Sequence, residues 1–269
     1  AINESGLTEE IPEFLNNVLN EFVESDRLDL WQEKVDELLP SYILDTKVYS
    51  EKCLTKLMPY YDFYLKKGIS EKTLKDFEAG YSTRETFAGR ILFPVRDFSN
   101  KIVGFNGRLV EWNEKSPYPK WLLTRSSKRY WVYNHKLAYN EILKKKEVIL
   151  VESIGDNLAL YESGIKNIIV LFGKELSPAI IKYLLSLQCK IIISTNKDGK
   201  GNNFTGEKAA EKIKSELDML FSNVEIRLRE FNDHMDVFEA LGRERLLDWY
   251  NSDLTDNKKI GQSNKIEIL

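Results

Sequence analysis

Cysteine and histidine are scarce in this sequence of 269 residues, which contains Cys53, Cys189, His135 and His234 and no others of either type. Neither cysteine has a partner at the short spacing of a zinc finger, so we expect no zinc site within the chain. Free cysteines are usually buried and reduced in cytosolic proteins. We adopt that interpretation for both, and it predicts a cytoplasmic location.

Long apolar runs are also absent: no stretch approaches the ~20 residues that a membrane-spanning helix needs, and no secretory signal is visible. The formal net charge is only -3, so the global basic excess of many nucleic-acid-binding proteins is missing. Any contact with nucleic acid must therefore come from a local basic patch. The chain starts without Met, as expected of a fragment or a processed chain.

Residues 1–66 have the spacing of amphipathic helices but no residues that suggest chemistry. The apolar positions that carry this spacing are Leu15, Val18, Leu19, Phe22, Val35, Leu38 and Leu39. We predict a helical lead-in over 1–66, which serves either as a packing element or as a docking element for a partner.

Residues 67–146 mix helix and strand signals. Ser70 is a good N-cap for a short helix. Strands are expected at 90–95 and 102–110, and the turn at 97–101 between them indicates a hairpin. We therefore expect an α+β subdomain here.

From residue 147 the pattern alternates between apolar strands and helices. Strands are expected at 148–151, 167–172, 190–195 and 224–228, and helices at 156–163, 177–187, 206–220 and 236–249. Four buried-type strands with crossover helices predict an α/β domain with a mostly parallel sheet over 147–250. A polar tail, 251–269, follows.

Acidic side chains follow three of these four strands. They are Glu152 and Asp156 after the first, Asp198 after the third, and Asp233 and Asp236 after the fourth. Because the carboxyl ends of parallel strands meet at one edge of a sheet, we expect these carboxylates to converge and to repel one another unless a cation lies among them. Such oxygen ligands suit Mg²⁺ or Mn²⁺, and two ions of this kind can activate a hydroxyl group and hold a phosphate.

Helix capping is the alternative interpretation for Asp156 and Asp236, since acidic residues at helix N-termini are common. Capping explains Glu152 less well, because that residue comes directly after a buried strand. The second strand ends in Gly173 and Lys174, and Lys174 is a candidate phosphate contact.

Two segments carry a family resemblance: residues 151–156 (VESIGD) and residues 170–177 (VLFGKELS) are similar to the strand-end motifs of the TOPRIM fold. That fold alone leaves topoisomerases, nucleases and recombination mediators open. Residues 67–81, 89–108 and 119–134 narrow the resemblance to the RNA polymerase core of bacterial and phage DnaG-type DNA primases, whose motifs occur in the same order and spacing.

This resemblance, which covers about residues 60–250, implies synthesis of short RNA primers on single-stranded DNA from ribonucleoside triphosphates. It implies that Glu152 and Asp198 are catalytic, and that Glu152, Asp156, Asp198 and Asp236 serve two or more Mg²⁺ or Mn²⁺ ions. The sequence departs from the family at Asn196, where a carboxylate is usual, so one metal ligand is an uncharged amide. In the family a second acidic residue accompanies the one that corresponds to Asp236, and in this sequence its position is taken by either Asp233 or His234.

The family's zinc-binding and helicase-binding domains have no counterpart in this sequence. We expect a separate or removed zinc-binding domain and a replicative helicase as partners. The Lys-, Ile- and Asn-rich composition and the divergent third-strand motif indicate a phage origin, and hence the host cytoplasm.

Residues 115–140 contain six basic residues and no acidic one, with aromatic residues interleaved, as is typical of single-strand binding. Trp131 and Tyr133 alternate as in a strand, which favours a place in the core. The candidate nucleic-acid or nucleotide contacts are Lys120, Arg125, Lys128 and Arg129 in this segment, Arg90, Arg96 and Arg108 near the hairpin, and Lys174. A structural ion pair is the alternative for each of the three hairpin arginines.

Three functions follow from these observations. The first is primer synthesis by two-metal nucleotidyl transfer. The second, motivated by Asn196, is a catalytically degenerate TOPRIM module that binds single-stranded DNA as a replication adaptor. The third is a TOPRIM nuclease, which the primase-like upstream segments disfavour.

Overall fold

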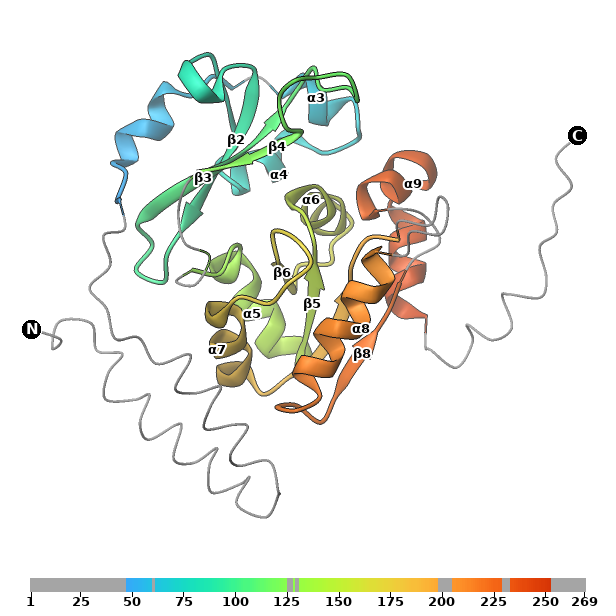
Figure 1. The fold of residues 1–269 in the computed structure, drawn as a ribbon. Coiled ribbons are helices and arrows are strands. Elements are labelled where there is room, and N and C mark those ends of the chain that lie inside the picture. Colours follow the sequence, from blue (N-terminus) through green and yellow to red (C-terminus); the bar gives the residue numbers. More distant parts are fainter. Residues whose placement is uncertain are drawn as a thin grey trace, which may run out of the picture.

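The computed structural model describes residues 47–59, 61–124, 128, 131–197, 205–228 and 233–252. Within these ranges the chain forms two four-stranded sheets. Figure 1 shows them one above the other, the first sheet in blue-green and green and the second in yellow to red. Residues 1–46 of the expected helical lead-in (1–66) and the tail from 253 onward lie outside the described residues.

The first sheet is antiparallel, with the strand order β1-β2-β3-β4. Its strands are β1 (Gly80–Ser82), β2 (Arg90–Arg96), β3 (Ile102–Leu109) and β4 (Trp121–Leu123). The predicted hairpin joins β2 to β3. Its turn is stabilised by the Asp97 carboxylate, which accepts the backbone N–H of Lys101 at 2.8 Å, and Asn100 there adopts the left-handed conformation that Asn tolerates.

Short helices cover this sheet: η1 (Glu51–Lys56), α3 (Asp62–Leu65), α4 (Glu71–Asp76) and η2 (Glu85–Phe87). Ser70 caps α4 as predicted, since its hydroxyl accepts the backbone N–H of Thr73. Gly80 lets the chain after η1 approach β1 closely. A Cβ at Gly80 would lie 2.5 Å from the Cβ of Leu57, so a larger residue would force the two segments apart.

The second sheet is parallel, with the order β6-β5-β7-β8. Its strands are β5 (Glu147–Val151), β6 (Ile168–Val170), β7 (Lys190–Ser194) and β8 (Val224–Ile226). The helices that follow them are α6 (Ile154–Glu162), α7 (Pro178–Leu187), α8 (Thr205–Leu217) and α9 (His234–Asn251). An α+β part followed by a parallel α/β domain is the fold class that the sequence predicted, and it is confirmed.

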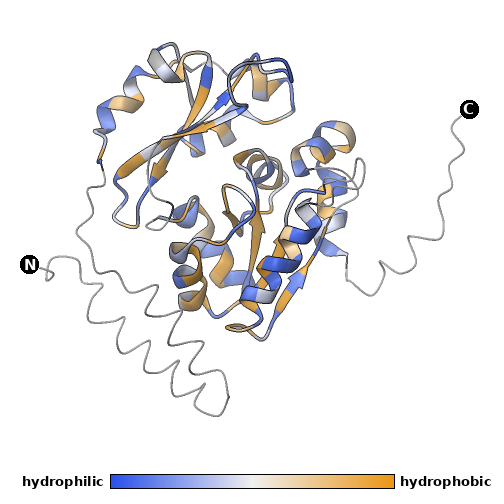
Figure 2. Cartoon of the chain, in the orientation of Figure 1, coloured by the Kyte–Doolittle hydropathy of each residue, from blue (hydrophilic) through white to orange (hydrophobic). Residues whose placement is uncertain are grey.

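Both faces of the second sheet are covered, which explains the unbroken apolar strands. Val148 and Leu150 face a core built with α5 (His135–Lys145), α7 and α8, whereas Ile149 and Val151 face a core built with α6 and α9. Figure 2 shows β5, in the middle of this sheet, as apolar along its length.

The two sheets share one core. Tyr64, Leu74 and Phe93 of the first part pack in the same buried cluster as Val151 of β5 and Leu158 of α6. Trp131 and Tyr133 lie in that cluster too, as the strand-like alternation predicted. Tyr133 also forms a single antiparallel bridge with Val170 of β6.

Helix α5 (His135–Lys145) was not predicted. It starts within the basic, aromatic segment and packs Ala138 and Ile142 against the second sheet. In the part of the chain that the structure describes, no helix is long and apolar enough to cross a membrane.

Candidate active site at the carboxyl edge of the parallel sheet

Glu152 lies where the predicted site is centred. It directly follows β5, the strand between β6 and β7, and it is partly exposed. One oxygen of its carboxylate, Oε1, accepts the backbone N–H of Asn196 at 2.7 Å, and Asn196 lies just after β7. The ends of two neighbouring strands thus meet at this carboxylate, as the parallel topology predicted.

Asp156 serves as a structural cap, the alternative given for it above. Its side chain is 0% exposed. One oxygen accepts the Ser153 hydroxyl at 2.8 Å in a capping box, and the other accepts the backbone N–H of His234 at 2.7 Å. These bonds tie the N-terminus of α6 to that of α9, so the geometry favours capping over metal ligation.

Asp233 and Asp236 lie together at the start of α9. Asp233 is the N-cap and accepts the backbone N–H of Asp236 at 2.7 Å. Partial desolvation and the nearby Asp233 carboxylate both raise the pKa of the Asp236 carboxyl, while Lys120 lowers it. Desolvation is the larger cause, and the like charge of Asp233 adds to it, a repulsion that a bound cation would relieve.

His234 faces inward and does not act as the partner of Asp236. It is buried, its Nε2 lies 2.9 Å from the Ser194 hydroxyl, and its ring packs on Trp249. Of the two residues considered for that position, Asp233 is therefore the one at the surface of the site.

The full metal-binding set is not tested by the structure, because Asp198 lies outside the described residues. Among the residues that are described, no group of three or more His, Cys, Asp or Glu side chains could hold a metal ion. The carboxylates of Glu152, Asp233 and Asp236 are nevertheless the type of oxygen ligand that binds a divalent cation. The predicted ligand set of Glu152, Asp156, Asn196, Asp198, Asp233 and Asp236 stays a prediction, with Asp156 already engaged as a cap.

Arg90 has a structural place in the first sheet. Its side chain is buried, and its guanidinium donates to the backbone carbonyls of Gly107 at 3.0 Å and Pro119 at 2.9 Å. These bonds hold the connection between β3 and β4 against β2. The predicted contact with nucleic acid does not fit this burial.

Arg96 is also occupied within the protein. Its guanidinium makes five hydrogen bonds. Two go to the Glu78 carboxylate, two go to the Glu51 carboxylate, and the fifth goes to the backbone carbonyl of Asn100. These ion pairs raise the pKa of Arg96. The structural ion pair, rather than the predicted template contact, describes Arg96 in this conformation.

Arg108 packs its guanidinium over the rings of Phe63, at 5.0 Å, and Trp112, at 6.0 Å. Burial lowers the pKa of Arg108, but a guanidinium keeps its charge at neutral pH. The side chain therefore brings a largely desolvated positive charge to the surface of the first sheet, and its predicted role in binding remains a prediction.

Three predicted lysines lie near the carboxyl edge. Lys120 is exposed, packs over Trp112, and acts electrostatically on Asp236. Lys128 donates to the carbonyl of Phe172 at the end of β6. Lys174 donates to the Thr205 hydroxyl at 2.6 Å, which connects the end of β6 to the start of α8. Arg125 and Arg129 lie outside the described residues.

Lys67 is a neighbour of the site that sequence reasoning missed. It forms an ion pair with Glu239 of α9 and lowers the pKa of Asp236. Its position immediately before Gly68, in a segment that resembles the primase family, was the available signal.

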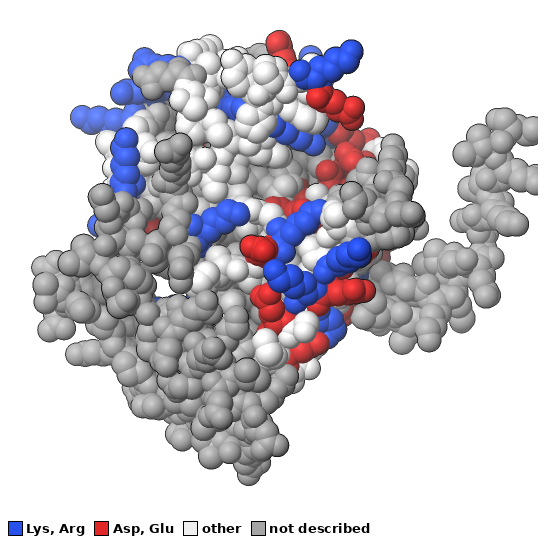
Figure 3. Space-filling view, viewed as in Figure 1, with Lys and Arg blue, Asp and Glu red and all other residues white. Residues whose placement is uncertain are grey.

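The charges around α8 are mixed rather than basic. Figure 3 shows Lys and Arg interspersed with Asp and Glu over this helix, and the pairs Lys212–Glu175 and Lys214–Asp218 account for part of the pattern. Two lysines of the first part, Lys120 and Lys67, lower the pKa of the Asp236 carboxyl.

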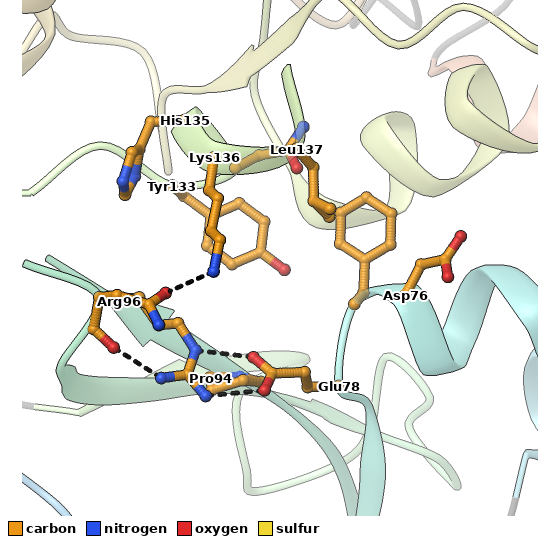
Figure 4. A pocket seen from close by; sticks show the side chains of 11 residues that line it. Asp76, Glu78, Pro94, Arg96, Tyr133, His135, Lys136 and Leu137 are labelled. Atoms are coloured by element: carbon orange, nitrogen blue, oxygen red, sulfur yellow. Dashed lines mark hydrogen bonds and ion pairs between the residues drawn. The ribbon is translucent and has the colours of Figure 1, made fainter. Parts of the chain in front are cut away.

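A separate cavity of about 190 Å³ lies between the first sheet and α5, lined in part by Asp76, Tyr133 and Lys136. Figure 4 shows Lys136 reaching from α5 toward the hairpin, where it donates to Asn100, and Arg96 paired with Glu78 below it. None of the predicted metal-binding residues lines this cavity.

Residues 149–241 match the family model described as Toprim-like. The chain is 26% identical over 219 residues to the DNA primase of Staphylococcus aureus (strain COL), and the match covers 78% of this chain and 35% of that protein. It is 32% identical over 121 residues to the DNA primase of Helicobacter pylori, covering 44% of this chain and 21% of that protein. The chain thus spans about a third or less of the length of these relatives.

Solved structures show the same fold. The primase of Aquifex aeolicus, with its zinc-binding and RNA polymerase domains, aligns with a TM-score of 0.61 at 21% identity, over 78% of this chain and 61% of that one. A DnaG primase catalytic domain bound to single-stranded DNA aligns with a TM-score of 0.59 at 17% identity, over 81% and 78% of the two chains. The second sheet and its helices therefore have the TOPRIM fold. The whole described chain has the fold of the DnaG-type primase catalytic core, and the resemblance drawn from the sequence is confirmed.

Proposed function

We propose that this chain is the catalytic core of a DNA primase, which synthesises short RNA primers on single-stranded DNA from ribonucleoside triphosphates during DNA replication. The observation that carries the proposal is the position of Glu152. Its carboxylate lies at the end of the central strand pair, held by Asn196. The similarity to DNA primases in sequence and fold supports the same activity.

The chemistry requires a nucleophile and charge neutralisation. Glu152 would accept the proton of the primer 3′-hydroxyl or hold a cation beside it, and Asp198, Asp233 and Asp236 would complete the ligand set. Two bound Mg²⁺ or Mn²⁺ ions would supply positive charge to the incoming triphosphate and lower the pKa of the attacking hydroxyl. Phosphoryl transfer of this kind depends mainly on positioning and on charge stabilisation.

The lysines near the edge would hold the anionic substrates. Lys120 lies close enough to Asp236 to shift its pKa, so a phosphate chain bound by Lys120 would pass beside the carboxylates. Lys128 and Lys174 flank the end of β6 and would contact the triphosphate or the template. Sequence-independent phosphate contacts suit a template that is copied rather than recognised.

The test is primer synthesis by the purified chain on single-stranded DNA with labelled ribonucleotides and Mg²⁺ or Mn²⁺. We expect short RNA products with the wild type, and at least a hundredfold less with Glu152→Gln, which keeps the shape and removes the charge. Glu244→Gln, on an exposed part of α9, is the matched control and should keep full activity. Full activity of Glu152→Gln would refute the assignment.

Asn196 supports a second candidate, a degenerate module that binds single-stranded DNA without polymerising, because an amide replaces a charged ligand. Tight DNA binding with no product would fit this candidate or a need for the zinc-binding domain, which adding that domain in trans would distinguish. Cleavage of linear DNA in the same buffer would instead indicate the nuclease. We also propose a replicative helicase as partner and a phage origin, and hence action in the host cytoplasm.

A further inference from the structure

The charge of this chain is divided unevenly along its length. Residues 1–46 contain twelve of the 42 acidic residues and only two of the 39 basic ones, a formal charge of -10. The remaining residues, 47–269, contain 37 basic and 30 acidic residues, a formal charge of +7. The small net charge of the whole chain therefore conceals an acidic segment joined to a basic body.

An exposed aromatic surface lies on the described part of the chain, at the tip of the β2–β3 hairpin. Phe98 at the tip packs on His135 of α5, at 4.9 Å between ring centroids, and on Tyr183 of α7, at 5.9 Å, yet remains 44% exposed. Tyr139, one helical turn beyond His135 on the same face of α5, is 46% exposed. We call Phe98, His135, Tyr139 and Tyr183 the hairpin-tip surface.

Lysines surround the hairpin-tip surface. Lys101, Lys136 and Lys182 are all exposed and come from the hairpin, α5 and α7. Figure 4 shows Lys136 extended from α5 toward the hairpin. The nearby carboxylates are largely neutralised, since Glu51 and Glu78 pair with Arg96. Asp97 is engaged in the hairpin turn through the backbone N–H of Lys101.

The acidic segment joins the body beside this surface. The backbone N–H of Tyr49 donates to the carbonyl of Ile102 at 2.8 Å, and Ile102 is the first residue of β3 after the hairpin turn. Residues 1–46 are therefore attached within a few residues of Phe98. Their apolar positions Leu15, Val18, Leu19 and Phe22 have helical spacing, which would give an apolar stripe, and Asp26 and Asp29 would continue the same face at that spacing.

We propose that residues 1–46 dock within the same chain on the hairpin-tip surface. The apolar stripe covers Phe98 and Tyr139, and the acidic side chains face Lys101, Lys136 and Lys182. The negative charge of residues 1–46 and the positive charge of the surrounding lysines favour this segment as the occupant of the surface. The covalent connection favours it further, because a short linker gives an effective concentration on the order of millimolar. Docking here clamps the hairpin of the first sheet to α5 and α7 of the TOPRIM domain. The proposal does not depend on primer synthesis.

Zero-length carbodiimide crosslinking of the full chain, read by mass spectrometry on an equal mixture of ¹⁴N- and ¹⁵N-labelled protein, tests the proposal. We expect isopeptide bonds from acidic residues of 1–46 to Lys101, Lys136 or Lys182, with both peptides carrying the same isotope. The exposed Lys208 and Lys212 of α8 serve as comparison lysines. Links mainly to α8, or the absence of links, would overturn the proposal, and mixed-isotope links would show that a second copy is the occupant instead.

Amide hydrogen exchange on two full-length variants provides the second test. Replacing Leu15, Val18, Leu19 and Phe22 by Ser should abolish these links and speed exchange at the hairpin tip and in the exposed turns of α5 about tenfold, because the cover is lost. Asn17→Ser with Asn20→Ser, on the opposite side of the predicted helix, is the matched control. Equal exchange in both variants and the wild type would refute the docking. Thermal melting of both variants is the folding control, since an unchanged melting temperature separates loss of docking from loss of folding.

Discussion

Asp156 of α6 accepts the backbone N–H of His234, the first residue of α9, at 2.7 Å, although the two residues are 78 positions apart. The same carboxylate closes the capping box of its own helix through Ser153. One buried carboxylate therefore fixes two helix N-termini, where the first backbone N–H groups have no acceptor within the helix itself and carry a partial positive charge.

We predict that Asp156→Ala lowers the free energy of unfolding by about 2–3 kcal/mol, because it leaves the buried N–H of His234 without its acceptor. Urea unfolding measures this loss, and Asp236→Asn, at a more exposed position of the same region, should change stability by less than about 1 kcal/mol. An Asp156→Ala protein with unchanged stability but weakened Mn²⁺ binding would show that Asp156 is a metal ligand after all.

Arg90 and Lys120 were predicted together as nucleic-acid contacts, and their surroundings now separate them. Arg90→Met should lower the free energy of unfolding by about 2–4 kcal/mol, since the carbonyls of Gly107 and Pro119 lose a buried charged donor. Lys120→Ala should change stability by less than about 0.5 kcal/mol. It should weaken single-stranded DNA binding and reduce the slope of log affinity against log salt by about 1.

Urea unfolding and fluorescence anisotropy with a labelled oligonucleotide at several salt concentrations measure both quantities. Folded Arg90→Met should bind DNA with the salt slope of the wild type. A reduced slope in Arg90→Met, or an unchanged one in Lys120→Ala, would reverse the two assignments.

The features that depend on local sequence could be predicted. The apolar run of β5 determines where Glu152 falls, and the alternation of strands and helices fixes the carboxyl edge at which it lies. Ser70 could be identified as a cap because its partner, Thr73, is three residues away.

The features that depend on distant partners could not be predicted. Arg96 pairs with Glu51, 45 positions away, and Arg90 donates to the carbonyl of Pro119, 29 positions away. The sequence next to either arginine therefore does not indicate its partner. Helix α5 was missed because its basic residues and Tyr139 resemble a single-strand-binding segment, whereas its two buried positions, Ala138 and Ile142, form only a short apolar stripe.

Cys189 should be an unreactive thiol. Burial and, to a smaller extent, the Glu147 carboxylate together raise the pKa of Cys189 to about 11. At pH 8 the thiolate fraction is then on the order of 100-fold lower than for an ordinary cysteine, and alkylation should slow by a similar factor. The rate should rise about tenfold per pH unit until the pKa is approached.

Iodoacetamide labelling, followed by peptide mass spectrometry in native buffer and in urea, measures this protection. The urea sample is the internal control, because unfolding restores the ordinary pKa. Equal labelling rates of Cys189 in native and unfolded protein at pH 8 would contradict the prediction.

Asn196 provides the sharpest test of the carboxyl edge, because Asn196→Asp adds a negative charge at the end of β7 without changing the side chain's size. Its backbone N–H already donates to Glu152, so the new carboxylate would lie near an existing one. Without divalent cations, we expect like-charge repulsion to lower the melting temperature. With Mg²⁺ or Mn²⁺, the additional charged ligand should strengthen metal binding, and binding to the folded state alone raises stability.

The prediction therefore depends on the metal: Asn196→Asp melts below the wild type in EDTA, and its melting temperature rises more than that of the wild type when Mg²⁺ or Mn²⁺ is added. Ser222→Asp, at an exposed position before β8, adds the same charge away from the edge and should show no metal-dependent gain. If Asn196→Asp responds to the ions no more than Ser222→Asp does, position 196 is not part of a metal site. The ligands would then have to be sought among the other carboxylates of the edge.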